Sequence, residues 1–498
     1  MSADPNTSAD PNSSADPTSS AKRDPIRESL RIAGEKVSRD RVIDVRHPFS
    51  GERIGTVPKA TLADVKRALK IAREHRSKLT RHERYGILMK AGALIAARRE
   101  ELARLITLES GLCLKDSRYE VGRASDVLLF AANQALVDSG EVFSCDLTAH
   151  GRNRKVYTLR EPLLGAIVAI TPFNHPLNQV IHKVAPGIAT NNRIVLKPSE
   201  KTPLTAYALA DILYEAGLPP QMLSVLTGDP AEIADELLTS PDMDLVTFTG
   251  GVSIGKYIAG KAVYKRQVLE LGGNDPIIVL EDADLEEAAA LAASGSYANS
   301  GQRCTAIKRM LVQESVADRF VELLVEKTER VKSGDPFDES MEMGTVIDEP
   351  SARRFEAVVN EAVAAGARLL VGNIRRGALY SPTVLDRVTP DMNVVRHETF
   401  GPVSPVIRFK TVEEAIRIAN GTAYGLSSSI CTNRIDLITR FIQELHVGSV
   451  NVREVPGYRL EITPFGGIKD SGLGCKEGVL EAMKSFCNTK TYSLPWTI

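Results

Sequence analysis

The sequence predicts an α/β protein whose core is two doubly wound, largely parallel sheets. Short apolar runs alternate with segments of helical spacing from about residue 165 to 249, and the same rhythm returns roughly from 276 to 455. The 498 residues are too many for one ordinary hydrophobic core. Polar and glycine-rich residues follow several apolar runs, which is where doubly wound sheets bind their ligands.

Composition excludes several classes of function. A formal net charge of -1 argues against a nucleic-acid or membrane partner, because either favours a basic face. The chain has no run of the roughly 18 apolar residues that a membrane-spanning helix needs. Its 6 cysteines are scattered, without a CxxC pair or metal-ligand spacing. We therefore expect a cytoplasmic protein with reduced thiols and no metal site.

The first 22 residues predict a disordered tail. Ser-Ala-Asp-Pro recurs at 2–5, 8–11 and 14–17, and so few apolar residues cannot offset the entropy lost on ordering. The tail lacks the apolar stretch of a secretory signal, and its acidic composition does not suit a mitochondrial presequence.

Residues from about 60 to 138 predict helices, because apolar residues recur at three- and four-residue spacing. Arg123 lies inside the third of these runs, 119–137. The simplest interpretation of Arg123 from the sequence is a pair with Glu120 or Asp126 on its own helix.

The alternating region that follows predicts strands at 165–170, 194–197, 223–226 and 245–248. Thr202 and Pro203 predict the start of a helix, as N-cap and first residue, and Gly217 predicts its end.

Cys304 is the first candidate for chemistry. It follows a glycine-containing turn, and a thiol there can attack a carbon electrophile if its pKa is lowered and the electrophile is held. A lone cysteine is otherwise a small buried apolar residue.

The dinucleotide fingerprint GxGxxG is absent here, but Gly250 and Gly251 lead from a strand into a helix whose N–H groups could bind a pyrophosphate.

These pieces belong to a set of motifs that resembles the NAD(P)-dependent aldehyde dehydrogenase superfamily over nearly the whole chain after residue 40. The motifs are, in chain order, Asn174 in Pro-Phe-Asn, Lys197-Pro198-Ser199-Glu200, Phe248-Thr249-Gly250, Glu270-Leu271-Gly272-Gly273, Gly301-Gln302-Arg303-Cys304, Glu398-Thr399-Phe400-Gly401-Pro402 and Pro464 to Gly472. Each motif alone is unspecific, and their number and order carry the resemblance.

The resemblance implies two Rossmann-like doubly wound domains plus a small β oligomerisation element. The NAD-binding domain would comprise 23–143 and 163–271, and the catalytic domain 272–470. The oligomerisation element would comprise 144–162 and 485–498. Its edge strands need partners, so we expect a homodimer or a homotetramer.

The resemblance also implies the chemistry of three residues. Cys304 would attack the aldehyde carbon as a thiolate, and the Asn174 side-chain amide with the Cys304 N–H would stabilise the oxyanion. A hydride would leave for NAD and a thioester would remain. Glu270 would be the general base, first for the thiol and then for the hydrolytic water.

The cofactor contacts follow from the same resemblance. Lys197 and Glu200 would bind the adenosine ribose, and Glu398 the nicotinamide ribose. Glu200 would accept from a 2′-OH and repel a 2′-phosphate, which favours NAD over NADP. The expected NAD contacts are Ile170, Thr171, Pro172, Phe173, Lys197, Ser199, Glu200, Phe248, Thr249, Gly250, Gly251, Gly255, Leu271, Glu398 and Phe400.

Four positions depart from the family pattern. Gly251 stands where serine is common, Asn274 where lysine is common, His397 where the first of two glutamates is common, and Lys476 where many members have a glutamate proposed as a second base. The departure at Lys476 leaves the base role to Glu270 alone.

Arginines indicate the substrate. Arg303 directly precedes Cys304, and in phosphate-handling members arginines aligned with Arg123 and Arg459 join it; Arg453 is the alternative to Arg459. Planar guanidinium groups suit a phosphate or phosphonate because they donate bidentately. A structural salt bridge is the alternative interpretation of Arg303, Arg123 and Arg459.

The neighbourhood of Asn174 refines this expectation. His175 stands where the non-phosphorylating glyceraldehyde-3-phosphate dehydrogenases have tyrosine, and the pattern is most similar to phosphonoacetaldehyde dehydrogenase. We therefore expect a small anionic aldehyde, phosphonoacetaldehyde first, with glyceraldehyde-3-phosphate, lactaldehyde or a semialdehyde as alternatives. The expected substrate contacts are Arg123, Asn174, His175, Arg303, Thr305 and Arg459.

Two further function classes are weighed. Acyl transfer to coenzyme A is disfavoured because such relatives usually lack the general base, and Glu270 is present. A catalytically silent structural protein would be expected to lose Cys304 or Asn174, and both are present.

Overall fold

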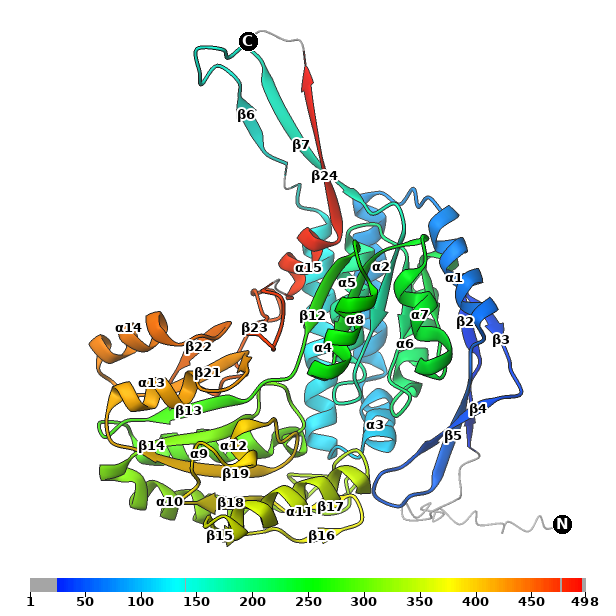
Figure 1. The fold of residues 1–498 in the computed structure, drawn as a ribbon. Coiled ribbons are helices and arrows are strands. Elements are labelled where there is room, and N and C mark those ends of the chain that lie inside the picture. Colours follow the sequence, from blue (N-terminus) through cyan, green and yellow to red (C-terminus); the bar gives the residue numbers. More distant parts are fainter. Residues whose placement is uncertain (1–24, 139, 475–476, 495–498) are drawn as a thin grey trace, which may run out of the picture.

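The computed structural model describes residues 25–138, 140–474 and 477–494. The expected tail at 1–22 and Lys476 lie outside the described residues. Figure 1 shows two bodies, each built on one large sheet, and a three-stranded arm that projects from the first body.

The first sheet has seven strands in the order β12-β11-β8-β9-β10-β2-β3. Its bounds are Arg266–Glu270, Met243–Thr249, Ala166–Ile170, Ile194–Lys197, Leu223–Val225, Leu30–Ile32 and Glu35–Val37. The strands from β12 to β10 run parallel, and β2 and β3 add an antiparallel edge. Among the parallel strands β8 comes first in the chain, and β9 and β11 lie on opposite sides of it. The strand order therefore reverses between β8 and β11, which is where such sheets bind ligands.

Helices cover both faces of this sheet (Figure 1). They are α1 Leu62–Glu74, α2 Arg81–Ala97, α3 Arg99–Ser110, α4 Leu114–Ala135, α5 Asn178–Ala189, α6 Leu204–Glu215, α7 Pro230–Thr239 and α8 Val252–Lys261, with the 3-10 turn η1 Pro220–Met222. The sheet's side chains are buried on both sides, in two separate apolar clusters. Because both faces of these strands are buried, their sequences are unbroken apolar runs.

The predicted start of α6 is wrong in its capping residue. Thr202 makes no cap; instead the buried carboxylate of Glu109 accepts from the N–H groups of Leu204 and Thr205, at 2.7 and 3.0 Å. Glu109 lies on α3, so a distant acid replaces the local hydroxyl at this helix N-terminus. Gly217 does follow the helix end with φ 105°, a conformation that suits glycine.

The second sheet has seven strands in the order β15-β18-β19-β14-β13-β21-β22. Their bounds are Arg368–Val371, Thr383–Asp386, Val403–Phe409, Ile307–Gln313, Asp275–Val279, Ser427–Cys431 and Ser449–Val452. The helices of this body are α9 Leu285–Tyr297, α10 Glu314–Glu329, α11 Glu349–Ala364, α12 Asn393–Arg396, α13 Val412–Asn420 and α14 Ile435–Glu444, with η2 Ala298–Gly301. Only β15 runs antiparallel to its neighbour in this sheet, so the doubly wound pattern is confirmed here as well.

The arm is a third sheet in the order β24-β7-β6, with bounds Cys487–Leu494, Lys155–Pro162 and Val142–Ser144. The helix α15 Val479–Ser485 leads into β24 (Figure 1). Three small pairings complete the strands: β1 Ile26–Arg27 with β5 Arg53–Pro58 and β4 Val42–Arg46, β16 Arg375–Arg376 with β17 Leu379–Tyr380, and β20 Tyr424–Gly425 with β23 Ile468–Lys469.

The fold class is as predicted: two doubly wound bodies and a small separate sheet. The domain boundaries stay a prediction. Within the described part of the chain, no helix combines the length and apolar character that crossing a bilayer requires.

Candidate active site

The loop that carries Cys304 is held in an unusual backbone conformation. Asn299, Ser300 and Gly301 all have positive φ, at 59°, 54° and 71°, between the end of α9 and the start of β14. Two non-glycine residues in this region cost free energy that the surroundings must supply. One support is the carboxylate of Asp116, which accepts from the Asn299 N–H at 2.8 Å.

The Cys304 thiol is protonated at neutral pH in the cofactor-free chain. Burial raises its pKa to about 11, although the nearby cations Lys308 and Arg459 oppose the shift. A protonated thiol is a poor nucleophile, so the arrangement requires a base.

The predicted oxyanion donor Asn174 belongs to the same hydrogen-bond network. Its side-chain amide donates to the carbonyl of Gln302 at 2.8 Å, and its own carbonyl accepts from the Asn299 side chain at 3.0 Å. The Gln302 side chain in turn accepts from the Ile347 N–H at 2.9 Å. These bonds fix Asn174, from the first body, against the residues that precede Cys304, in the second.

The predicted base Glu270 is the last residue of β12 and is 3% exposed. Its carbonyl accepts from the Gly250 N–H at 3.0 Å, and Glu270 forms an isolated antiparallel bridge with Gly472. The next residue, Leu271, donates to the Ser471 carbonyl at 3.0 Å. The backbone on both sides of Glu270 is therefore fixed where the chain passes from one sheet to the other.

Two arginines lie near Cys304, and a third, Arg123, lies near both of them. Arg303 and Arg459 each lie within electrostatic range of the Cys304 sulfur and of Arg123. Burial lowers the pKa of both Arg303 and Arg459. The Arg303 Nε and the Arg459 Nη1 are buried, and neither has a hydrogen-bond acceptor within the described ranges. A buried guanidinium N–H without an acceptor is costly, so these atoms suit an anionic ligand.

Arg123 has a partner that the sequence did not reveal. Its Nε donates to Glu461 at 2.5 Å, and the other Glu461 oxygen lies 2.6 Å from the His182 ring nitrogen. Burial acts to raise the pKa of Glu461, but His182, Arg123 and Arg459 outweigh it and hold that pKa well below its usual range. The ion pair of Arg123 is thus with the distant Glu461, while Glu120 on its own helix interacts with it only at longer range, so the expected local pair is wrong.

The other expected substrate residues are also placed. His175 lies 3.5 Å from Glu120, and Thr305 is buried beneath Gly457. Arg453 points elsewhere, since it pairs with Glu287 at 2.9 Å and is exposed. Of the two, only Arg459 lies within electrostatic range of Cys304 among the interactions of the described residues, and its contact with the substrate stays a prediction.

The carboxyl ends of β8 and β11 carry two buried hydroxyls, on Thr171 and Thr249. Neither has a hydrogen-bond partner in the described part of the protein, and both lie where the strand order of the first sheet reverses. Gly250 and Gly251 lead from β11 into α8, and a Cβ at Gly251 would project into open space. Unused hydroxyls beside an open helix N-terminus fit the pyrophosphate of a dinucleotide.

The remaining expected cofactor contacts line the same region. Lys197, at the end of β9, pairs with Glu200, and Ser199 lies between them. A Cβ at Gly255 would collide with Leu271, so this glycine permits close packing of α8 on the strand. The rings of Phe173 and Phe400 meet edge to face with centroids 5.9 Å apart. Ile170, Pro172 and Phe248 lie at the ends of β8 and β11.

Lys308 and Glu461 contribute to the site and were not among the predicted residues. Lys308 is the second residue of β14, and its buried ammonium donates to the Cys304 carbonyl and to Glu398. Neither residue has a local signal in the sequence, because Lys308 is followed in the same strand by Arg309 and Glu461 lies 338 residues from Arg123.

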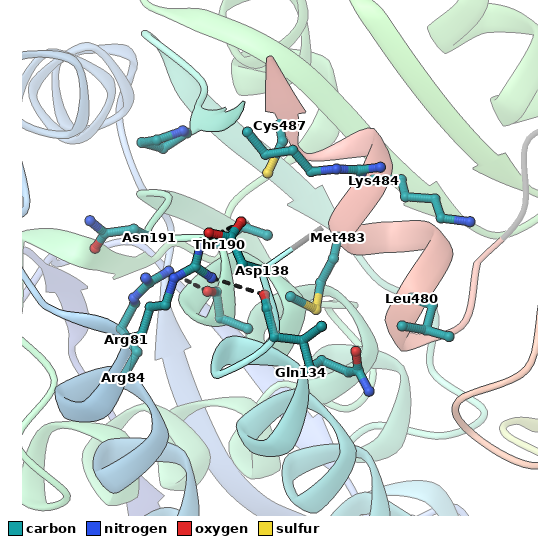
Figure 2. Close-up of a pocket in the computed structure, with 14 residues that line it drawn as sticks. Arg81, Arg84, Gln134, Asp138, Thr190, Asn191, Leu480, Met483, Lys484 and Cys487 are labelled. Carbon is teal, nitrogen blue, oxygen red and sulfur yellow. Dashed lines mark hydrogen bonds and ion pairs between the residues drawn. The ribbon is translucent and has the colours of Figure 1, made fainter. Parts of the chain in front are cut away.

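A second group of arginines lines a cavity of about 180 Å³ at the base of the arm (Figure 2). There Arg81 donates to the carbonyls of Ala135 and Val137, at the end of α4, and Arg84 to that of Ala189, at the end of α5. Helix C-termini attract cations, so these guanidinium groups serve as caps. The cavity shares no lining residue with the region around Cys304.

Comparisons with known proteins agree with this geometry. The model of the aldehyde dehydrogenase family matches residues 35–492. The 3-sulfolactaldehyde dehydrogenase of Priestia aryabhattai is 39% identical over 450 residues, which are 90% of this chain and 94% of that protein. The sulfoacetaldehyde dehydrogenase of Neptuniibacter caesariensis is 37% identical over 448 residues, 89% of this chain and 98% of that protein.

The solved structure of an NAD-dependent aldehyde dehydrogenase from Sinorhizobium meliloti is similar throughout. It aligns with a TM-score of 0.91 at 34% identity, over 96% of this chain and 97% of that one. The match extends across both sheets and the arm. The chain therefore belongs to the aldehyde dehydrogenase family and is an oxidoreductase that uses NAD or NADP.

Proposed function

We propose that the protein oxidises a small anionic aldehyde to its carboxylic acid, and that phosphonoacetaldehyde, giving phosphonoacetate, is its best substrate. The observation that carries the proposal is the pair of buried guanidinium N–H groups near Cys304, on Arg303 and Arg459, for which the described residues provide no acceptor. A tetrahedral oxyanion group offers several acceptors in one small volume, and each charge-assisted hydrogen bond contributes roughly 1.5–3 kcal/mol.

Chemistry begins at the Cys304 sulfur. Because burial keeps the thiol protonated, Glu270 takes its proton as the sulfur attacks the aldehyde carbon. The carbonyl oxygen becomes an oxyanion, which accepts from the Asn174 amide and the Cys304 N–H. Loss of one such donor costs roughly 3 kcal/mol of transition-state stabilisation.

The hydride that leaves the thiohemiacetal carbon would need an acceptor, and that is the chemistry NAD would supply when bound. Glu270 releases the thiol's proton to solvent and, as a carboxylate again, deprotonates the water that hydrolyses the remaining thioester; the Cys304 sulfur leaves as a thiolate while the carboxylic acid forms. The role of Glu270 in this step separates the proposal from acyl transfer to coenzyme A, which needs no hydrolytic water.

NAD is proposed over NADP because of Glu200. This carboxylate lies at the carboxyl end of β9 paired with Lys197, where an adenosine ribose would be bound. A second negative charge on a 2′-phosphate would lie close to Glu200 and be repelled.

An aldehyde with a sulfonate group is the second candidate. Glu461 neutralises part of the positive charge of Arg123, which suits a monoanion better than a dianion. The two relatives described above are named for sulfolactaldehyde and sulfoacetaldehyde, whose sulfonate carries one charge. Lactaldehyde, glyceraldehyde-3-phosphate and semialdehydes remain weaker candidates.

The test is NADH formation across a panel of phosphonoacetaldehyde, sulfoacetaldehyde, glyceraldehyde-3-phosphate, lactaldehyde, succinic semialdehyde and propanal, with Cys304→Ala as the blank. We expect phosphonoacetaldehyde to have the highest kcat/KM, and Arg303→Ala to remove its advantage over propanal. Arg453→Ala is the matched control, because Arg453 faces away from the site and should leave the order unchanged. If propanal has the highest kcat/KM, the proposal of an anionic substrate is refuted. If sulfoacetaldehyde has the highest kcat/KM, the substrate is a sulfonate and not a phosphonate.

We also propose that the arm formed by β6, β7 and β24 joins copies of the chain into a homodimer or homotetramer. Its outer strands β6 and β24 are edges, and Val142, Phe143 and Tyr492 are exposed on them. The division into NAD-binding domain, catalytic domain and oligomerisation element, and a cytoplasmic location, remain part of the same proposal. Light scattering of the purified chain measures the oligomeric state.

A further inference from the structure

Lys308 lies at the centre of the site and makes three direct contacts. Its side chain is 1% exposed, and its Nζ donates to the Gly273 carbonyl at 2.8 Å, the Cys304 carbonyl at 2.8 Å and the Glu398 Oε1 at 2.7 Å. An ammonium group has three donors, so every N–H of Lys308 is used. The side chain is thus fixed in one orientation.

The acceptors of Lys308 come from three separate segments. Gly273 follows the strand that carries Glu270, Cys304 follows the loop with positive φ, and Glu398 precedes β19. Lys308 therefore joins the predicted base's strand, the nucleophile's loop and the carboxylate expected at the nicotinamide ribose.

Glu398 is held by only one of its two oxygens. Oε1 accepts from Lys308 and from the Gly273 N–H at 3.2 Å. Oε2 receives no hydrogen bond from the residues described, and it lies over Gly272, where an added Cβ would be 2.2 Å from it. Lys308 thus fixes one oxygen and leaves the other directed over a glycine, available to a ligand hydroxyl.

We propose that Lys308 is a positioning residue that links the Cys304 loop to the carboxylate of Glu398. The nucleophile and the bound cofactor are thereby held at a fixed position relative to each other. This inference rests on the role proposed above for Glu398 at the nicotinamide ribose, but not on the identity of the aldehyde. The lysine touches neither substrate nor cofactor; it acts through its neighbours.

The charged groups near Cys304 determine how the loss of Lys308 would change the pKa of the thiol. Lys308 and Arg459 favour the thiolate, while Asp275 and Glu398 disfavour it, and Glu270 lies on the adjoining strand. Replacing Lys308 by an uncharged residue would remove one of the cations near the thiol, leaving Arg459 and Arg303, and would leave both carboxylates. The fraction of Cys304 that is thiolate at a given pH should therefore fall.

The experiment compares Lys308→Met with the wild type in two assays that need no aldehyde. Calorimetry gives the Kd for NAD, and peptide mass spectrometry follows alkylation of Cys304 by iodoacetamide as a function of pH in the cofactor-free enzyme. We expect the Kd to rise about tenfold or more, because a charge-assisted bond that holds Glu398 is lost. We expect the alkylation profile to move to higher pH, with rates near pH 8 lower by about tenfold.

Lys183→Met is the matched control. Lys183 is also fully buried in an ion pair, with Glu477, but it contacts neither Cys304 nor Glu398. This control should lose stability, yet leave the NAD affinity and the alkylation profile unchanged. If the profile of Lys183→Met moves as far as that of Lys308→Met, the effect is general destabilisation and the proposal fails.

Two further outcomes are decisive. Unchanged NAD affinity together with an unchanged alkylation profile in folded Lys308→Met would overturn the proposal. If Lys308→Met does not fold, Glu398→Gln takes its place: it should bind NAD more weakly and alkylate faster at each pH, since a carboxylate near the thiol is lost. An unchanged alkylation profile in that variant would equally refute the link. None of these outcomes depends on which aldehyde is oxidised.

Discussion

Two cysteines of this chain lie among arginines, and the two surroundings differ in how the guanidinium groups are used. Around Cys304, Arg303 and Arg459 keep buried N–H groups for which the described part of the chain offers no acceptor. Around Cys487, Arg81 and Arg84 donate to the carbonyls that end two helices (Figure 2). The presence of arginines beside a thiol therefore does not identify an active site. Buried guanidinium donors that have no acceptor among the described residues do indicate one.

The largest difference in kcat should appear when each of the two cysteines is replaced separately by alanine. Cys304→Ala should lower kcat by at least about 10³-fold, because no other residue can form the thioester. Cys487→Ala should leave kcat within about twofold, since its sulfur lies in the separate cavity at the base of the arm. Steady-state NADH formation measures both. Equal losses in the two variants would contradict the distinction.

A smaller effect is expected when an unused donor is removed. Arg459→Ala should lower kcat/KM for the best anionic aldehyde by about 10- to 100-fold, the value of one charge-assisted hydrogen bond. Its effect on propanal should be much smaller, because propanal has no anionic group to bind. A parallel loss for both aldehydes would mean that Arg459 supports the fold, through the Phe465 ring 3.8 Å from its guanidinium, instead of the substrate.

The pH dependence of alkylation sharpens the comparison further. Because burial raises the pKa of Cys304 to about 11, its alkylation in the cofactor-free enzyme should speed up about tenfold per pH unit from about pH 7 to 10. The rate rises with pH because only the thiolate reacts, and raising the pH increases the fraction of Cys304 that is thiolate. A plateau near neutral pH would show that the thiolate is already formed without the cofactor.

The smallest effect concerns the arginines that act as caps. Arg84→Met should lower the free energy of unfolding by about 1–2 kcal/mol, because the Ala189 carbonyl loses a charged donor at a helix end. Kinetic constants should not change. Urea denaturation and the aldehyde assay on the same sample test both statements, and a normal stability with altered kinetics would contradict them.

Much of the fold could be predicted because its signals are local. The unbroken apolar strands at 166–170 and 194–197 and the glycine at 217 each show their structure within a few residues. The motif residues likewise mark the strand ends that meet at the site. What could not be predicted depends on residues far apart: Glu109 caps a helix 95 residues later, and Arg123 is paired with Glu461.

Lys308 shows the same limit within the site. From the sequence it is an ordinary lysine beside Arg309, and nothing nearby indicates three acceptors. Only the pairing of β13 with β14 brings Gly273 and Glu398 within its reach. Sequence patterns identify the reacting groups, while the residues that position them are set by the tertiary structure.

The last strand of the chain has a consequence for how the protein is made. Val479, Ala482 and Phe486 belong to the apolar core of the first body, and β24 pairs with β7 along its whole length. The ribosome therefore completes the entire second sheet before it supplies the residues that finish the first. The half that is synthesised first must keep this core surface incomplete until the final segment emerges, and a chain that stops early would leave that surface exposed.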